Sequence, residues 1–399
     1  MNSLIPARPR RDSSTWAGYI IIASYAWFIF GFSATQALLR DEQGTSRTIS
    51  SLHAVFLSIG GIAAGLLAAR FILLLGRGRF IWIATLGTVI GVLIYTAPGG
   101  LPITVFGAAI ASFFGSAAII GASAFLFDHE GKAGPAALTE ANALAALGGV
   151  LSPLAIGLGS ILVLGWRAGV WIMFIGIVVG LLLMRRNPKV FRVPPDEQIR
   201  ESTHQPFPRL FWWSVITLFL FLSVEFTLTI WSADLLRERG GFGAETAAAS
   251  VAAVTGGIFI GRVIGSRFAE YFPVDRILAF AVGIVMIGWT MVWVTTSGAI
   301  MLFGLLLSGI GVSVFWPIGV SRVVLASGGQ SDRATAMCAI AGGTAGGLGP
   351  FALGFLADTV GVHSAFLLLP AILVLGFLLM MIKPVTRALP PAIPSTSGQ

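Results

Sequence analysis

The chain has 399 residues, of which 56% are hydrophobic and 11% are charged, and its formal net charge is +8. Soluble domains are usually about 45–50% apolar and about 25% charged, so the composition and the mean hydropathy of +0.90 exclude an ordinary soluble protein and indicate a polytopic membrane protein. The single cysteine, Cys338, excludes an internal disulfide.

The first predicted element is a membrane-spanning helix over about 16–39. The apolar run is longer than that of a signal peptide, and no small-residue cleavage site precedes Arg40. We therefore expect this helix to be retained as the first of several spans.

Further apolar runs, each near the roughly 20 residues that cross a bilayer, continue to the end of the chain. They are separated by charges and by turns such as APGGLP (97–102). The sequence therefore predicts an all-α membrane protein with twelve spans. Their predicted positions are 16–39, 50–75, 80–98, 101–127, 136–163, 167–184, 210–236, 246–270, 277–296, 298–325, 334–358 and 364–383.

The basic residues are distributed unevenly between alternate loops. If the N-terminus is cytoplasmic, the outer segments hold only Arg40, Arg47, Arg167, Arg237 and Arg239, and nearly all other basic residues lie inside. This agrees with the positive-inside rule and accounts for the net charge without a nucleic-acid partner. We expect a multi-pass protein of the inner (plasma) membrane with both termini in the cytoplasm.

The longest polar stretch between spans, 185–209, divides the predicted helices six and six. The segments LSPLAIG (151–157) and LGPFALG (348–354) repeat at an offset of 197 residues, and several glycines repeat at 196. We predict an N-terminal six-helix bundle (1–184), a cytoplasmic linker (185–209) and a C-terminal six-helix bundle with a short polar tail (210–399).

Short motifs resemble those of a known family. GIAAGLLAAR (61–70) stands where the major facilitator superfamily usually has a Gly-x-x-x-Asp-Arg loop motif, with Ala69 replacing the aspartate. The segments GRVIGSR (261–267) and WPIG (316–319) resemble its fucose-permease-like (sugar porter) branch. The chain thus resembles this superfamily over essentially its whole length. The resemblance implies the major facilitator fold, alternating access and a substrate site at the midplane between the two halves.

Glu225 lies in the middle of the seventh predicted span. A carboxylate at the bilayer centre costs on the order of 2.5–3.5 kcal/mol on insertion scales, so such residues normally face a cavity or a partner. A carboxyl that is neutral when enclosed and ionised when wet could carry a proton, and could also bind a polar substrate. The alternative is a hydrogen bond that holds neighbouring helices together.

Three further polar residues are candidates for the site. Arg262, in the eighth span, could clamp a carboxylate substrate bidentately, or it could pair with Glu225 or act in gating. Glu140 and Asn142 open the fifth span, where the helix dipole alone favours an acid. They could also form a cytoplasmic gate or a second proton site.

Cavity-lining residues are also expected where the resemblance places them, on the first, fourth, seventh and tenth spans. These candidates are Trp27, Gln36, Trp231 and Trp316, and Trp316 with its following proline also predicts a helix break. The alternative for the aromatic residues is a position at the lipid interface.

We expect structural roles for three more residues. We expect Asp234 to form a solvated ion pair with Arg237, Asp358 to cap a helix end, and His53 to take no part in proton transfer, although histidine titrates near neutrality.

The sequence contains no HExxH, GxSxG or GxxxxGK[ST] motif and no Cys/His cluster. We therefore predict no enzyme, cofactor or metal, and a monomeric, proton-coupled symporter of a small, polar, sugar-like solute. The partners would be the solute, protons and the bilayer. One alternative is a carboxylate transporter that uses Arg262. Another is a drug or toxic-metabolite efflux antiporter, which the absence of arginine in the fourth span disfavours. A channel is disfavoured by the six-plus-six repeat.

Overall fold

The computed structural model describes residues 9–162, 165–187, 206–268, 272–382 and 384–385, and all regular structure in these ranges is helical. Most of the predicted linker lies outside them. The elements are α1 (Ser13–Gln43), α2 (Arg47–Ser50), α3 (Leu52–Leu75), α4 (Arg77–Tyr95), α5 (Leu101–Glu130), the 3₁₀ turn η1 (Gly131–Ala133), α6 (Gly134–Ile161), α7 (Trp166–Arg186), α8 (Arg209–Gly240), α9 (Ala244–Phe268), α10 (Val274–Val294), α11 (Gly298–Val312), α12 (Phe315–Leu325), α13 (Ser331–Ala365) and α14 (Leu368–Ile382).

Local sequence explains where α1 begins and ends. The Asp12 side chain accepts hydrogen bonds from the backbone N–H groups of Ser14 and Thr15, at 2.9 and 2.8 Å, and so caps the helix. At the other end Gly44 adopts a left-handed conformation with φ of 61°, which glycine reaches without steric cost.

Ten helical segments among the described residues are long and apolar enough to cross a membrane. One of them, Leu101–Ile161, has 61 residues and contains two predicted spans on either side of η1. The helix α14 is shorter, with 15 residues. An all-helical membrane protein is therefore confirmed, whereas the number of twelve spans stays a prediction.

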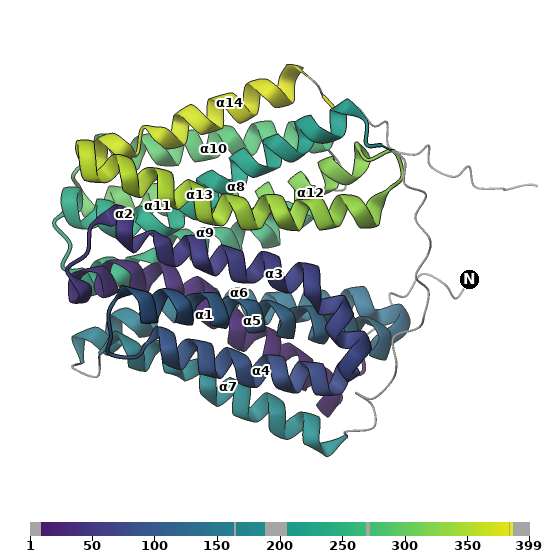
Figure 1. Cartoon of the computed structure of the whole chain (residues 1–399). Helices are drawn as coiled ribbons and strands as arrows, with labels where there is room; N and C mark the ends of the chain where they lie inside the picture. Colours follow the sequence, from purple (N-terminus) through teal and green to yellow (C-terminus); the bar gives the residue numbers. More distant parts are fainter. Residues whose placement is uncertain (1–8, 163–164, 188–205, 269–271, 383, 386–399) are drawn as a thin grey trace, which may run out of the picture.

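The helices of the first half of the chain (α1–α7) and those of the second half (α8–α14) gather on opposite sides of the molecule (Figure 1). Within the first half, α1 packs against α5, α6 and α7, and within the second half α8 packs against α13 and α14. Between the halves, α6 contacts α9 and α3 contacts α13. The division into two bundles at the linker stays a prediction.

Glycine allows the two halves to approach closely. A Cβ atom on Gly157 of α6 would lie 2.6 Å from the Cβ of Ala249 on α9, and one on Gly343 of α13 would overlap the side chain of Ile62 on α3. In a bilayer, helices associate through close packing rather than exclusion of water, so small residues belong at such contacts.

Candidate functional site

A cavity of about 510 Å³ lies between the two halves and is lined by helices from both. Ligand pockets usually measure about 300–1,000 Å³, so a small organic molecule would fit. Eight helices contribute to its wall, and most of the lining is apolar. Its polar and aromatic functional residues include Tyr25, Ser33, Ser58, Ser112, Ser116, Ser123, Asn142, Glu225, Arg262 and Trp316.

Glu225 of α8 lines this cavity, as the sequence led us to expect. The residue is 9% exposed, and its Oε2 atom is buried without a hydrogen-bond partner among the described residues. A buried carboxylate that no protein group satisfies is costly in an apolar environment. The cavity therefore contains a strong hydrogen-bonding group that is free to meet a proton or a solute.

Arg262 of α9 lies on the same cavity wall and is half-buried. Its guanidinium acts electrostatically on the Glu225 carboxylate, although no ion pair joins the two side chains among the described contacts. The second half thus contributes two opposite charges to the cavity, and each remains able to contact a solute.

Asn142 and Trp316 complete the group of predicted residues that reach the cavity. The Asn142 amide donates to the Leu138 carbonyl at 2.9 Å. The Trp316 ring packs against Gly342, where a Cβ atom would lie 2.7 Å from it. The predicted helix break is present but lies just before Trp316, between Val312 and Phe315. Pro317 then occupies the first turn of α12, where a missing N–H is tolerated.

The structure places Trp27, Gln36 and Trp231 outside the cavity lining and gives each a hydrogen bond elsewhere. The indole of Trp27 donates to the Gly169 carbonyl at 2.9 Å, and that of Trp231 donates to the Pro350 carbonyl at 2.9 Å. The Gln36 amide donates to the Tyr95 hydroxyl at 3.1 Å. These three residues hold helices together within one half.

Glu140 also lies outside the cavity lining. Its carboxylate accepts hydrogen bonds from Arg11, at 2.5 and 3.1 Å, and from the Tyr19 hydroxyl at 3.0 Å. The hydrogen bond and the negative charge of Glu140 raise the pKa of Arg11 above its ordinary value. Glu140 therefore ties the segment before α1 to the start of α6.

The hydroxyl groups in the cavity were not among the site residues predicted from the sequence. Ser112 and Ser116 are one helical turn apart on α5, and Tyr25 and Ser58 come from α1 and α3. The spacing of four residues on the fourth predicted span was a usable signal, because such residues share one face of a helix.

Charged residues join the two halves at one end of the molecule, which we name the α2 end after residues 40–50. Arg40 of α1 pairs with Asp234 of α8 at 2.5 Å, and Asp41 pairs with Arg237 at 2.8 Å. The expected pairing of Asp234 with Arg237 is therefore wrong. Asp234 is buried, and its partner comes from the other half.

Asp358 of α13 does act as a cap, but for a helix of the other half. Its carboxylate accepts hydrogen bonds from the backbone N–H groups of Arg47 and Thr48, at 3.0 and 2.8 Å, at the start of α2. Arg47 also approaches Glu238 of α8 at 3.5 Å. Between described residues, all hydrogen bonds and ion pairs that join the halves lie at the α2 end.

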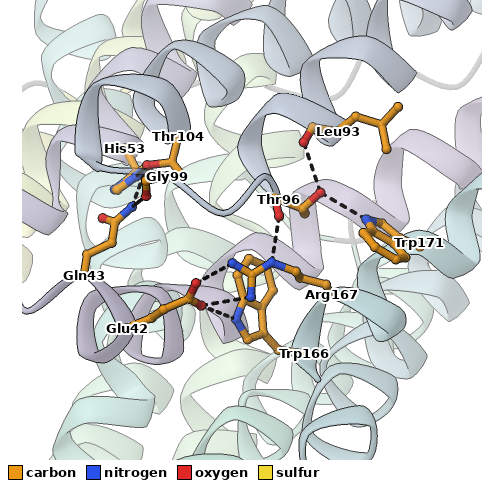
Figure 2. A network of polar contacts seen from close by, with 10 residues as sticks. All are labelled: Glu42, Gln43, His53, Leu93, Thr96, Gly99, Thr104, Trp166, Arg167 and Trp171. Atoms are coloured by element: carbon orange, nitrogen blue, oxygen red, sulfur yellow. Dashed lines mark hydrogen bonds and ion pairs between the residues drawn. The ribbon is translucent and has the colours of Figure 1, made fainter. Parts of the chain in front are cut away.

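A second polar network fastens the first half at the same end (Figure 2). Arg167 donates to both carboxylate oxygens of Glu42, at 2.5 and 2.9 Å, and to the Thr96 carbonyl at 2.7 Å. The two ring nitrogens of His53 lie 2.8 Å from the Ser50 carbonyl and 2.8 Å from the Thr104 hydroxyl. His53 is buried in this network rather than in the cavity.

Comparison with known proteins agrees with this architecture. The family model described as Major Facilitator Superfamily matches residues 17–287. Glucose/galactose transporters of two Brucella abortus strains (biovar 1 strain 9-941 and strain 2308) are 28% identical over 155 residues. This region covers 38% of the chain and only 37% of each relative.

Solved structures share the fold at low sequence identity. A mutant of the nucleoside transporter NupG matches with a TM-score of 0.76 and 9% identity, covering 93% of this chain and 100% of that one. The peptide transporter POT in complex with sulfate matches with a TM-score of 0.75 and 14% identity, covering 95% of this chain and 96% of that one. A bacterial homologue of the human lysosomal transporter Spinster matches with a TM-score of 0.66 and 16% identity, covering 95% of this chain and 98% of that one.

Proposed function

Because the chain belongs to the major facilitator superfamily, we propose that it carries a small, polar, sugar-like solute through the central cavity. It is a multi-pass membrane transporter and not an enzyme. The proposals for the solute, for the coupling ion and for alternating access rest on the cavity and on the contacts around it.

The observation that carries the proposal is the buried Oε2 of Glu225, which has no hydrogen-bond partner in the described part of the chain and lies in a cavity lined by both halves. Intramembrane carboxylates normally mark a substrate or proton pathway. The serine and tyrosine hydroxyls in the lining support a polar solute. The partial similarity to glucose/galactose transporters supports a sugar-like one.

We place twelve spans in two six-helix bundles, 1–184 and 210–399. The segment Leu101–Ile161 has 61 residues, and at 1.5 Å per residue it far exceeds the roughly 30 Å hydrocarbon core. Two crossings, with the turn at η1, account for its length. The distribution of basic residues supports cytoplasmic termini and a cytoplasmic 185–209 linker in an inner membrane.

The position of the contacts between the halves supports alternating access. The polar contacts between described residues of the two halves lie at the α2 end, which the proposed topology puts on the outer face. This arrangement corresponds to a cavity closed to the outside. Opening it requires Arg40 to leave Asp234, while Glu225 gains or loses a proton as access changes.

A ligand screen on purified protein tests the proposal. A solute that binds the native state stabilises it and raises the melting temperature, and the stabilisation grows with the logarithm of the ratio of solute concentration to Kd. We expect neutral monosaccharides such as D-glucose or D-galactose to raise it and to enter proteoliposomes. Stabilisation by no neutral sugar in the panel would contradict the proposal.

A second candidate function is carboxylate transport, because Arg262 lines the cavity and forms no ion pair among the described contacts. A guanidinium binds a carboxylate through two parallel hydrogen bonds. Stabilisation by organic acids in the same screen, without stabilisation by sugars, would favour this candidate.

A further inference from the structure

Most serine and threonine hydroxyls in the described helices bond to their own helix. Ser24 donates to the Ile20 carbonyl at 2.7 Å and Ser160 donates to the Ile156 carbonyl at 3.2 Å, and many others do the same. This back-bonding is the usual way in which a helical hydroxyl is satisfied away from water. A polar group without a partner is costly inside a bilayer.

The serines that line the cavity depart from this pattern. None of the five donates to the carbonyl three or four residues before it, among the contacts of the described residues. All five belong to the first half: Ser33, Ser58, Ser112, Ser116 and Ser123. Ser33 and Ser58 are only 5% and 8% exposed, and neither has a hydrogen-bond partner in the described part of the chain.

Tyr25 extends this group of hydroxyls. Its OH lies 3.4 Å from the Ser112 carbonyl and 3.4 Å from the hydroxyls of both Ser112 and Ser116, at the far limit of a hydrogen bond. The ring fits there because residue 115 is glycine, and a Cβ atom at that position would overlap it. The long contacts leave Tyr25 able to bond to a group that enters the cavity.

The two walls of the cavity therefore differ in charge. The first half presents hydroxyls and the Asn142 amide, which are neutral, whereas Glu225 and Arg262 both come from the second half. A hydroxyl donates and accepts hydrogen bonds, as does the hydroxyl of a solute, whereas a carboxylate only accepts them. The first-half wall thus matches a neutral solute that bears several hydroxyl groups.

We infer that Tyr25, Ser58, Ser112 and Ser116 form a hydroxyl-binding subsite, in which the first half recognises hydroxyl groups of a neutral polyhydroxylated solute. This inference deepens the proposed function and rests on it. Glu225 and Arg262 of the second half then serve proton coupling, whereas the first-half wall sets the specificity for the solute.

Calorimetric titration with D-glucose, D-galactose and the monodeoxy derivatives of each tests the subsite. A neutral hydrogen bond is worth about 0.5–1.5 kcal/mol, which corresponds to roughly a 2- to 12-fold change in Kd. We expect Ser112→Ala, Ser116→Ala and Tyr25→Phe each to weaken binding of the parent sugar by this factor. For one deoxy derivative, the variant and the parent chain should bind with the same affinity, because the sugar already lacks the hydroxyl that the variant can no longer bind.

The matched control is Ser160→Ala, which removes a first-half hydroxyl that bonds to its own helix outside the cavity. It should leave Kd unchanged for every sugar. Melting temperatures identify any variant that fails to fold, and Tyr25→Phe retains the ring and its packing. If the parent chain binds a sugar and the three variants bind it equally well, the subsite is wrong and the proposed function stands. If the parent chain binds no sugar, the proposed function itself fails.

Discussion

The Arg40 guanidinium of α1 lies 2.5 Å from the Asp234 carboxylate of α8, and this ion pair joins the two halves of the chain. The side chains are only 11% and 3% exposed. Removing one partner of a buried pair usually costs about 3–5 kcal/mol, because the remaining charge stays buried without compensation. The pair therefore stabilises the arrangement in which the α2 end is closed.

We expect Asp234→Asn to open the α2 end more often and to lower the melting temperature. Ala54, which lines the cavity, can be replaced by cysteine in a Cys338→Ala background. Its labelling by a membrane-impermeant thiol reagent outside the cell should increase. Glu42→Gln is the control, since the Glu42–Arg167 pair lies at the same end but within the first half, and the Glu42 side chain is 41% exposed. Unchanged labelling in Asp234→Asn would show that the pair does not control access.

Glu225→Gln should abolish accumulation of the solute driven by a proton gradient. Glutamine retains the shape of the side chain and much of its hydrogen bonding but cannot release a proton. Exchange of labelled for unlabelled sugar across proteoliposomes should persist near the parent rate. Glu245→Gln, at the start of α9 and outside the cavity lining, should accumulate normally. Full accumulation by Glu225→Gln would move proton coupling to another group.

Arg262→Lys separates the two candidate solutes. Lysine keeps the charge but loses the planar fork that binds a carboxylate bidentately. We expect the Kd for a neutral sugar to change less than about threefold. A charge-assisted hydrogen bond is worth about 1.5–3 kcal/mol. A loss of tenfold or more in affinity for an organic acid would therefore identify the carboxylate transporter.

The Asp12 cap predicts a dependence of stability on acid pH. Burial alone would raise the pKa of Asp12, but hydrogen bonds from the Thr15 backbone and from His129 bring it below the ordinary value of 3.8. A carboxyl with a lowered pKa stabilises the fold above its unfolded-state pKa, and this contribution is lost as pH falls through the folded-state pKa.

Asp12→Ala should therefore lower stability by about 1 kcal/mol at pH 7, the usual cost of losing a helix cap. The difference in melting temperature from the parent should shrink below about pH 4, as the parent carboxyl protonates. Asp12→Asn keeps a capping side chain and should lose less stability at pH 7 than Asp12→Ala. A difference that is constant from pH 7 to pH 3 would contradict this role.

The proposed topology can be tested at the turn between α10 and α11. Ser297 is exposed there, and Cys338 is buried. With Cys338 replaced by alanine, Ser297→Cys should react with an impermeant thiol reagent on intact cells. Cysteine at Ser331, exposed at the start of α13, should react only after permeabilisation. The reverse pattern would invert the orientation.

The sequence by itself was sufficient to predict the class of protein and the family. The apolar runs predicted a helical membrane protein, and the motifs resembled the superfamily that the family comparison confirms. The position of Glu225 in the middle of an apolar span predicted a cavity-facing carboxylate, and the structure places it on the cavity wall. These conclusions succeed because composition and hydropathy are local properties of the chain.

Only the tertiary structure decided which side chains meet. It paired Asp234 with Arg40 rather than Arg237, gave Trp27 and Trp231 backbone partners, and placed five serines on the cavity wall. The physical reason is the solvent. In water, an apolar stripe shows which face of a helix is buried. In lipid, the outward face and much of the packed face are both apolar, so the sequence carries little record of helix rotation.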